Sequence, residues 1–368
     1  MHPTNETLRR PPPGAPPFQG WGRDFSLALK IVLTFTVLCT AACNRKTSSN
    51  PQIVSAFRAA VIIPGSTADG GWNYSAKEGA LLLEKELKLP QPVNFIENVE
   101  ASKRKTLLRD YGRDGYNLVI CHGYEFNQVV KEIAPEFPKT RFIVSGYDQP
   151  DPHFGSIVYQ LGEAAYLCGA AAAKVTQTGH VGFIAAQPVP PVELCYRGFR
   201  NGFLKYRPDG QVREPVYIEG PRPWEDSSAA KVKTQALLRL TAPAAIDVLF
   251  QNADAASRGI FEAVQEHSGP VFVFGANRDQ NDTNATTKIL GSAVIHVDRA
   301  FLRAAREVQA GTYTPHVESE TVKTGIIECV MNPKLSKLVG DKVAADCLST
   351  IAEARQALIE GKADPYVR

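Results

Sequence analysis

Short apolar runs separated by segments of helical spacing fill the chain from residue 59 onward. Seven runs are rich in β-branched and aromatic residues and nearly free of polar ones: 59–63, 118–121, 142–145, 181–185, 248–251, 271–274 and 293–295. Strands that helices cover on both faces have this continuous apolar pattern, whereas half-exposed strands alternate. The pattern therefore predicts buried, mainly parallel strands.

The segments between these runs have the spacing of amphipathic helices. Apolar residues recur every three or four positions at Ala76, Ala80, Leu83 and Leu87, and again from Phe126 to Phe137. The small-residue run 164–173 predicts a helix packed closely on its neighbours, with Gly179 as an end signal. Strands alternating with helices indicate an α/β protein with doubly wound parallel sheets.

The order of these elements predicts two lobes. Two halves rich in strand–helix–strand units cover 57–157 and 158–276, and a length of 368 residues suits two domains. We expect 277–313 to return to the first lobe and 314–368 to complete the second. A ligand cleft is expected between the lobes.

The start of the chain predicts a targeting segment. Residues 1–24 are rich in proline, and the apolar run 31–42 is shorter than the roughly 20 residues that span a membrane. Thr-Ala-Ala before Cys43 is typical of a lipoprotein signal peptide over 1–43, with lipid on Cys43 and a tether over 44–56. The alternative is an anchor helix that is never cleaved. Both place the rest of the chain in the cell envelope, facing the periplasm or the exterior.

Charge, cysteine content and motifs exclude several functional classes. The 41 Lys and Arg residues against 38 Asp and Glu form no dense basic run, so nucleic acid is not an expected partner. The chain lacks Walker A, G-x-S-x-G and H-E-x-x-H strings, and we expect no cofactor and no metal. Cys121, Cys168 and Cys195 lie in apolar contexts typical of the core. Cys329 and Cys347 are the pair expected to bridge, if any does.

Ligands of doubly wound sheets lie beyond the carboxyl ends of the strands. The loops there hold Asp, Asn, Gln and aromatic residues rather than nucleophiles, and they are 64–74, 122–125, 186–187, 251–254 and 275–280. An aromatic face stacks on a flat ring, while amides and carboxylates satisfy its polar edge. These loops predict a site for a small, planar, polar molecule.

The sequence resembles a known family over residues 57–330. The resemblance is carried by Ala68-Asp-Gly-Gly-Trp-Asn-Tyr-Ser-Ala-Lys-Glu-Gly79, Tyr116-Asn-Leu-Val-Ile-Cys-His-Gly-Tyr124 and Gly275-Ala-Asn-Arg-Asp-Gln280, among others. These strings are similar to the basic membrane protein family, substrate-binding lipoproteins of ABC importers that include purine nucleoside receptors. The resemblance implies a type I periplasmic-binding-protein fold, a purine or nucleoside ligand between the lobes, and an ABC permease as partner.

The loops and the resemblance together nominate ten ligand-binding residues: Asp69, Trp72, Asn73, Gly123, Tyr124, Gln187, Trp224, Asn252, Asn277 and Asp279. Trp72 stands where the family presents an aromatic ring to the base, and Gly123 lets a ligand approach the backbone. Asn277 stands where nucleoside binders of the family usually have Asp, and Ile295 where they usually have Lys. The implied ligand is therefore a purine nucleoside or a free purine-like heterocycle.

Several of these residues also have a purely structural interpretation. Trp72 suits a packing anchor at a helix start, and Asp69 suits a cap of that helix. Trp224 lies in a proline-rich loop, and His122 suits a hydrogen-bonded loop histidine. Asn277 and Asp279 suit turns at the expected hinge.

The sequence predicts a monomeric substrate-binding protein of an ABC importer rather than an enzyme. One alternative is a receptor of the same fold that reports its ligand to a membrane sensor. Another is a nucleoside hydrolase that uses Asp254 and Asp279 as a pair of acids.

Overall fold

The computed structural model of the chain describes residues 57–367. The predicted signal peptide, the tether and the lipidation site at Cys43 lie outside the described residues. Within residues 57–367, no helix combines the length and the apolar character that a membrane span requires.

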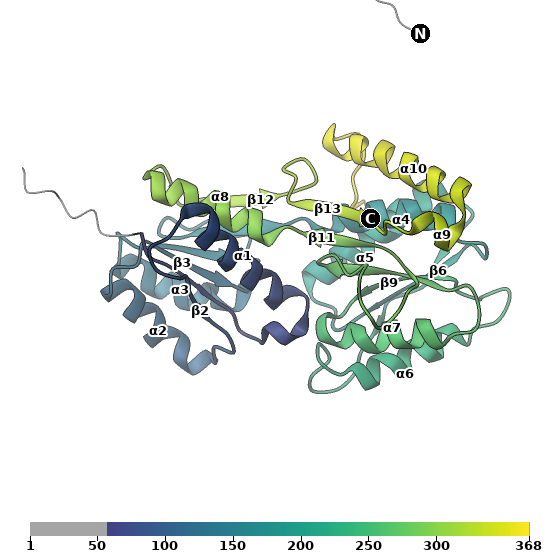
Figure 1. Cartoon of the computed structure of the whole chain (residues 1–368), viewed down its shortest axis with the longest axis horizontal. Helices are drawn as coiled ribbons and strands as arrows, with labels where there is room; N and C mark the ends of the chain where they lie inside the picture. Colours follow the sequence, from purple (N-terminus) through teal and green to yellow (C-terminus); the bar gives the residue numbers. More distant parts are fainter. Residues whose placement is uncertain (1–56, 368) are drawn as a thin grey trace, which may run out of the picture. The chain divides into compact units, whose positions relative to one another are not determined.

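The first sheet has six parallel strands in the order β12-β5-β4-β3-β1-β2. Helices α1 and α8 cover one face and α2 and α3 cover the other, so the central strands pack on both sides (Figure 1). The strands are β1 (Ala59–Ile62), β2 (Asn94–Ile96), β3 (Leu118–His122), β4 (Arg141–Ser145), β5 (Gly155–Tyr159) and β12 (Val317–Glu320). The helices are α1 (Trp72–Leu87), α2 (Ala101–Arg113), α3 (Asn127–Ile133) and α8 (Val297–Ala310).

The second sheet has the order β13-β11-β10-β9-β6-β7, with β8 also paired to β6, and only β13 runs antiparallel. Helices α4 and α5 cover one face, with α10 packed on α4, and α6 and α7 cover the other. Its strands are β6 (His180–Ala185), β7 (Gln211–Val212), β8 (Val216–Tyr217), β9 (Val248–Asn252), β10 (Phe272–Asn277), β11 (Ile289–Ile295) and β13 (Ile327–Met331). Its helices are α4 (Leu161–Val175), α5 (Pro190–Tyr206), α6 (Ser227–Leu238), α7 (Ser257–Glu266), α9 (Leu335–Val339) and α10 (Asp341–Ile359).

The predicted architecture of two doubly wound α/β lobes is confirmed. All seven apolar runs form strands, and their residues alternate between the cores on the two faces of each sheet. In β1, for example, Val61 packs toward α1 and α8, while Ala60 and Ile62 pack toward α2 and α3. Burial on both faces is the reason that these runs contain no polar alternation.

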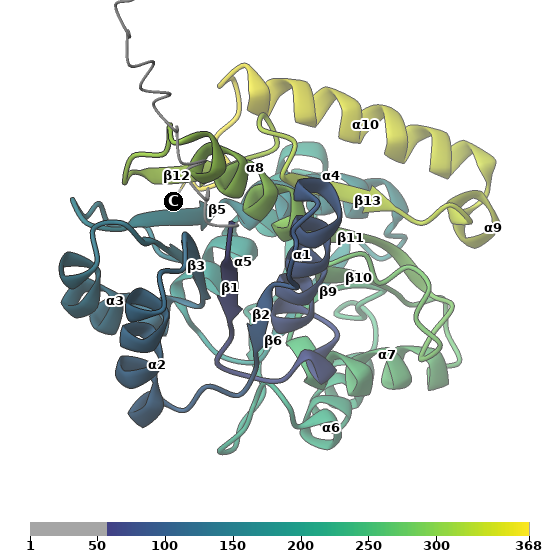
Figure 2. The same ribbon diagram turned by 60° about the vertical axis from the view of Figure 1, so that its left-hand side comes forward.

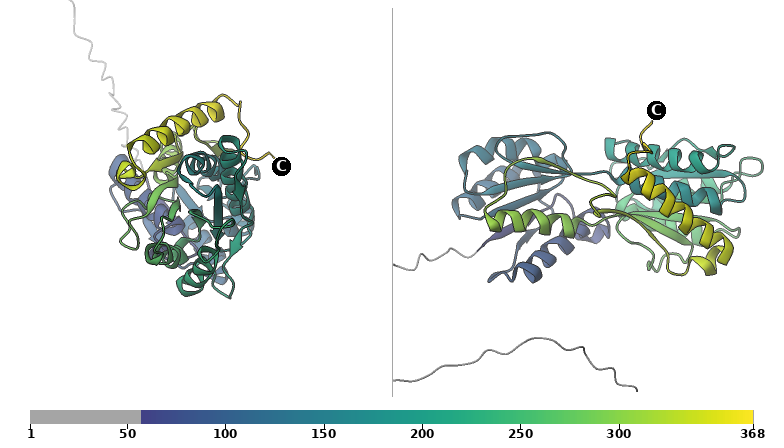
Figure 3. Two further views of the ribbon diagram at one scale, coloured as in Figure 1. Left: turned by 90° about the vertical axis from the view of Figure 1, so that its right-hand side faces the viewer. Right: turned by 90° about the horizontal axis from the view of Figure 1, so that it is seen from above.

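The chain crosses between the sheets three times, after β5, β11 and β12 (Figures 2 and 3). The predicted boundary at residue 277 differs from this pairing, because β11 lies between β10 and β13 in the second sheet. The return to the first lobe begins at His296, where α8 starts and packs on α1. The predicted assignment of 314–368 to the second lobe is likewise wrong for β12, which pairs with β5 in the first sheet.

Glycine residues let the backbones of helices α4 and α5 pack directly against each other. A Cβ placed on Gly198 of α5 would lie 2.0 Å from the carbonyl oxygen of Gly162 in α4, and one on Gly202 would lie 2.0 Å from that of Tyr166. Close approach of two helices requires such small residues at the contact. The predicted small-residue helix is therefore the innermost helix of the second lobe, with almost all of its residues buried.

Candidate functional site

The loop after β1 leads into α1 through a cap made by Asp69. Its carboxylate accepts hydrogen bonds from the backbone N–H groups of Gly71 (3.0 Å), Asn73 (2.7 Å) and Tyr74 (3.0 Å), which lie at the start of α1. It also accepts one from the Asn73 side-chain amide at 2.9 Å. The structural interpretation of Asp69 as a helix cap is confirmed. Asn73 Oδ1 is buried and has no partner among the described residues.

Trp72 is fixed by stacking and by a chain of hydrogen bonds. Its ring stacks on His122 at 3.8 Å between centroids and meets Tyr159 edge-on at 5.8 Å. His122 Nε2 donates to the Trp72 carbonyl at 3.1 Å, so Nδ1 accepts from Ser145 Oγ at 2.9 Å, and Ser145 accepts from the Tyr159 hydroxyl. Burial lowers the pKa of His122 to about 3, so its ring is neutral, as this chain requires.

Gly123 and Tyr124 follow β3 and lie beside Gly146, which packs against the Trp72 ring. A Cβ on Gly146 would lie 3.2 Å from Trp72 Cζ2 and 3.8 Å from the backbone nitrogen of Tyr124. Gly123 has φ +140°, and a Cβ there would lie 2.5 Å from Glu125 Oε2. The space that the glycine leaves is therefore filled by Glu125, whose pKa burial raises. Tyr124 is 60% exposed beside it.

The second lobe reaches this loop through Asp254, at the start of η4 (Asp254–Ala256). The Asn277 side-chain amide donates to Asp254 Oδ1 at 2.7 Å, and the Trp72 backbone N–H points to the same oxygen at 3.4 Å. A Cβ on Gly71 would lie only 2.8 Å from it. Asp254 and Asn277 both have left-handed backbones, with φ of +43° and +69°. Strain of this kind gathers at functional sites, and here it lies where the lobes touch.

The environment of Asp254 raises the pKa of its carboxyl group toward neutral pH. Burial, followed by the charge of Asp69, raises its pKa to about 7, and the bonds from Asn277 and Trp72 offset only part of this effect. The sequence suggests a role for Asp254 only as one of the two acids of a nucleoside hydrolase. The only signal for its role was a carboxylate two residues after the end of an apolar strand.

Asp279 does not form the expected acid pair with Asp254. It is exposed and accepts the backbone N–H of Asn281 at 2.9 Å within its own loop. It lines a cavity of about 240 Å³ at the crossing, with Ser75, Glu78, Arg278, Val294, Ile295, His296, Val297 and Asp298. The acid whose charge acts on Asp254 is Asp69, and the carboxylate of Asp69 is already hydrogen-bonded to the N–H groups at the start of α1. This geometry does not support the hydrolase alternative.

Arg278 makes a second contact between the lobes. Its guanidinium lies 3.3 Å from Glu78 of α1 and 4.6 Å from the centre of the Tyr74 ring. Asn277 is the last residue of β10 and Asp279 lies in the loop that follows, so both belong to the second lobe and not to the hinge segment that the sequence predicts.

Three nominated residues lie apart from the Trp72 loop. Asn252 is 4% exposed, and its amide donates to Cys195 Sγ at 3.7 Å inside the second lobe. Gln187 is half-exposed after β6, where its carbonyl accepts the N–H of Val189. Trp224 is half-buried, and its carbonyl accepts the N–H of Ala256, which ties its loop to η4.

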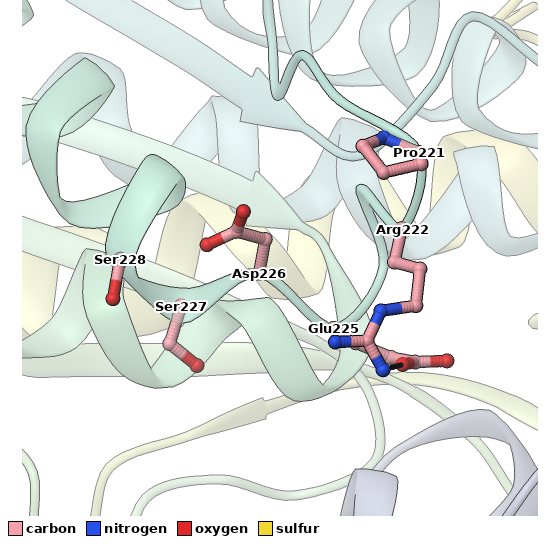
Figure 4. A pocket seen from close by; sticks show the side chains of 6 residues that line it. All are labelled: Pro221, Arg222, Glu225, Asp226, Ser227 and Ser228. Atoms are coloured by element: carbon pink, nitrogen blue, oxygen red, sulfur yellow. Dashed lines mark ion pairs between the residues drawn. The ribbon is translucent and has the colours of Figure 1, made fainter.

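The proline-rich loop beside Trp224 and the start of α6 border a polar cavity of about 370 Å³ that is open to solvent (Figure 4). Its lining is Pro221, Arg222, Glu225, Asp226, Ser227 and Ser228. Asp226 caps α6 by accepting the N–H of Ala229 at 2.9 Å, and Arg222 pairs with Glu225 at 3.2 Å. The charged groups of this cavity are thus already partnered.

The structure therefore brings together Asp69, Trp72 and Asn73 of the first lobe with Asp254 and Asn277 of the second. The Asp254 carboxylate accepts the backbone N–H of Trp72 in the first lobe and the side-chain amide of Asn277 in the second. Within residues 57–367, no cluster of three or more His, Cys, Asp or Glu side chains suits a metal ion. The arrangement offers a fixed aromatic ring, amides and a carboxylate, which are groups that can hold a flat polar ligand.

Comparison with known proteins places this site in a family. An ABC transporter nucleoside-binding protein of Lactococcus lactis is 23% identical over 357 residues, covering 91% of this chain and 97% of its own. A purine-binding protein of Brucella abortus is 24% identical over 82% of this chain and 81% of its own.

Solved structures show the same fold. A solute-binding protein of an ABC transporter system from Aeropyrum pernix superposes with a TM-score of 0.70 at 19% identity, covering 83% of this chain and 92% of its own. A transcriptional activator of the comK gene from Bacillus halodurans gives 0.68 at 22% identity, covering 84% and 99%. The fold is thus the expected type I periplasmic-binding-protein fold.

The family model of the PnrA-like ABC transporter substrate-binding proteins matches residues 56–351, which include both lobes and every residue of the Trp72 and Asp254 loops. The predicted resemblance is confirmed. This chain belongs to the family of PnrA-like, basic-membrane-protein substrate-binding proteins of ABC transporters.

Proposed function

We propose that this protein binds a purine nucleoside or a purine-like heterocycle between its lobes and delivers it to an ABC permease. The observation that carries the proposal is the meeting of Trp72, at the start of α1, with the Asp254–Asn277 pair of the second lobe. A ligand held there touches both lobes, so binding favours their approach.

Trp72 supplies the stacking surface. It is half-buried, and its orientation is set by His122 and Tyr159, so little side-chain freedom is lost when a ring stacks on its exposed part. Burial keeps His122 neutral, which leaves no cation beneath the indole. A neutral flat heterocycle is the ligand that such a surface favours.

The polar groups around Trp72 complement a heterocycle with a donor edge. Asn73 Oδ1 is a buried acceptor without a partner among residues 57–367, and a buried acceptor gains from an incoming N–H or O–H donor. The family's nucleoside binders usually carry an acid at the position of Asn277. In this chain the Asn277 amide donates to the Asp254 carboxylate at 2.7 Å, so Asp254 supplies an acid next to that position. That carboxylate is a candidate acceptor for ribose hydroxyls.

The proposal is tested by thermal unfolding with a panel of purines, purine nucleosides, pyrimidine nucleosides and sugars. A ligand present at about 100 times its Kd adds about 2.7 kcal/mol to the free energy of unfolding. We expect stabilisation by at least one purine or purine nucleoside and none by the sugars. Absence of any shift with every purine and nucleoside contradicts the proposal.

Variants then locate the site. Trp72→Ala is expected to abolish the ligand-induced shift. The control is Tyr206→Ala, which removes a half-buried ring of α5 in the second lobe, where Tyr206 contacts Lys174. An equal loss of the shift in both variants means that ring deletion acts through general instability, and it refutes a role for Trp72 in the site.

A second candidate function is a ligand-sensing receptor of the same fold. A structure of the same fold is named as a transcriptional activator, so the fold is compatible with a regulatory role. Deletion of the gene separates the two candidates. Loss of labelled purine uptake supports delivery to a permease, whereas intact uptake with altered transcription supports sensing.

We also propose that the chain is a monomer anchored by lipid on Cys43 outside the cytoplasm. The family consists of ABC transporter substrate-binding proteins, which work with a membrane permease. Metabolic labelling with a radioactive fatty acid is expected to mark the wild-type chain but not Cys43→Ser. Labelling of both chains, or of neither, contradicts the anchor.

A further inference from the structure

Two cysteines far apart in the sequence meet inside the second lobe. Cys168 lies in the middle of α4, and Cys329 lies in β13, the antiparallel edge strand of the second sheet. Their sulfur atoms are 3.5 Å apart. The sequence had paired Cys329 with Cys347 instead, but Cys347 Sγ donates to the carbonyl of Ala171 at 3.6 Å.

The other described cysteines have different surroundings. Cys195 receives a hydrogen bond from Asn252, and Cys121 lies in the first sheet beneath α2 and α3. Among residues 57–367, Cys168 and Cys329 are the two cysteines with sulfurs within hydrogen-bonding distance of each other. Cys329 also lies 3.7 Å from Met331 Sδ, so sulfur atoms surround it on two sides.

The two sulfur atoms are already in van der Waals contact, so only a small movement separates them from a bond. A disulfide has sulfur atoms about 2.05 Å apart, so closing the pair needs a movement of about 1.5 Å. Rotation about the Cα–Cβ bonds supplies movements of this size. We propose that Cys168 and Cys329 form a disulfide when the folded chain meets a small-molecule disulfide or a thiol oxidoreductase in its disulfide form.

The two thiols have unequal roles in this reaction. Cys329 is half-exposed, so its thiolate attacks the oxidant first and releases one thiol, which leaves a mixed disulfide on Cys329. The Cys168 thiolate then attacks Cys329 Sγ and releases the second thiol. The two protein thiols lose two protons and two electrons, and the oxidant's disulfide is reduced to two thiols.

Burial sets the speed of the second step. Cys168 has no exposed surface, and this burial together with Cys329 raises the pKa of its thiol well above the usual value. Its thiolate is therefore scarce, and the second step is expected to be the slower one. The bridge would tie β13, which returns to the second sheet after the last crossing, to the innermost helix of that lobe.

The test uses the full chain, incubated with oxidised and reduced glutathione and then treated with an alkylating reagent to block free thiols. Mass spectrometry of peptides is expected to show a linked pair containing Cys168 and Cys329, about 2 Da lighter than the two reduced peptides together. Oxidised protein is expected to unfold at a higher denaturant midpoint than reduced protein, because the cross-link restricts the unfolded chain.

Two variants make the result specific. Cys347→Ser is expected to retain the linked pair and the oxidation-dependent shift of the midpoint. Cys168→Ser is expected to lose both, while Cys329 carries a mixed disulfide with glutathione. A Cys329–Cys347 peptide, or Cys168 and Cys329 both alkylated after prolonged oxidation, overturns the proposal.

Discussion

Replacement of Asp254 by Asn tests whether the contact between the lobes is linked to a proton. The side chain keeps its shape, and its oxygen still accepts from Asn277 and from the Trp72 N–H. What disappears is a carboxyl group whose pKa is about 7 in the folded protein, against 3.8 ordinarily. The unfolded chain is expected to have the ordinary value.

The sign of the effect follows from where the proton is bound. Between pH 4 and pH 7 the folded protein holds a proton on Asp254 that the unfolded chain has lost, so the free energy of unfolding falls as pH rises through this window. Above pH 7 the contribution is constant. Three pKa units correspond to about 4 kcal/mol, and partial exposure of the side chain reduces this to about 1–3 kcal/mol.

Denaturant unfolding of the wild type and of Asp254→Asn at pH 4.5, 6, 7 and 8 measures the difference. The two proteins are expected to be similar at pH 4.5, and the variant more stable at pH 8 by about 1–3 kcal/mol. His122, whose pKa is lowered, gives a slope of the opposite sign, but it is present in both proteins and cancels.

Asp279→Asn is the matched control, because it removes an exposed carboxylate of the same lobe whose hydrogen bond lies within its own loop. It is expected to leave the pH profile of the wild type unchanged. Parallel profiles for the wild type and Asp254→Asn refute the reasoning, since Asp254 then has the same pKa in the folded and unfolded chains.

Three further substitutions test packing and capping by denaturant unfolding, each followed by circular dichroism. Gly71→Ala places a Cβ 2.8 Å from Asp254 Oδ1 and is expected to cost about 1–3 kcal/mol, with no loss expected if the lobes do not touch there. Asp69→Ala removes the cap of α1 and is expected to cost about 1–2 kcal/mol, part of which Asp69→Asn should restore. Gly198→Ala must separate α5 from the Gly162 carbonyl and is expected to cost about 3 kcal/mol, and a neutral result would contradict the close contact.

The strands predicted from sequence are those buried on both faces, because only burial leaves a continuous apolar run. The strand β12, Val317–Glu320, carries two glutamates and lies at the edge of its sheet, so it leaves no such pattern. The same holds for β2, which is three residues long and partly exposed. The error in the lobe boundaries follows directly, because β12 is the strand with which the chain rejoins the first sheet after β11.

The candidate site was predictable in its first-lobe half, and in its second-lobe half only at Asn277. Trp72 and Asp69 follow an obvious strand and precede an obvious helix, so their place at a helix start could be read from the pattern. The contact from Asp254 depends on a left-handed backbone at a residue other than glycine, which no local pattern indicates. The inward direction of the Asn252 amide is equally invisible in the sequence, since a polar residue at a strand end can point into the lobe as well as out of it, and its contact with ligand stays a prediction.

The threefold crossing of the chain also governs the order in which the protein can be assembled. The first sheet receives its last strand from Val317–Glu320, and the second receives its last strand from Ile327–Met331. Neither lobe can complete its hydrogen-bonded sheet until about nine-tenths of the chain has left the ribosome, because its last strand is made that late. A growing chain of this topology stays incompletely folded through most of its synthesis, which is the state in which a polypeptide can be threaded across a membrane.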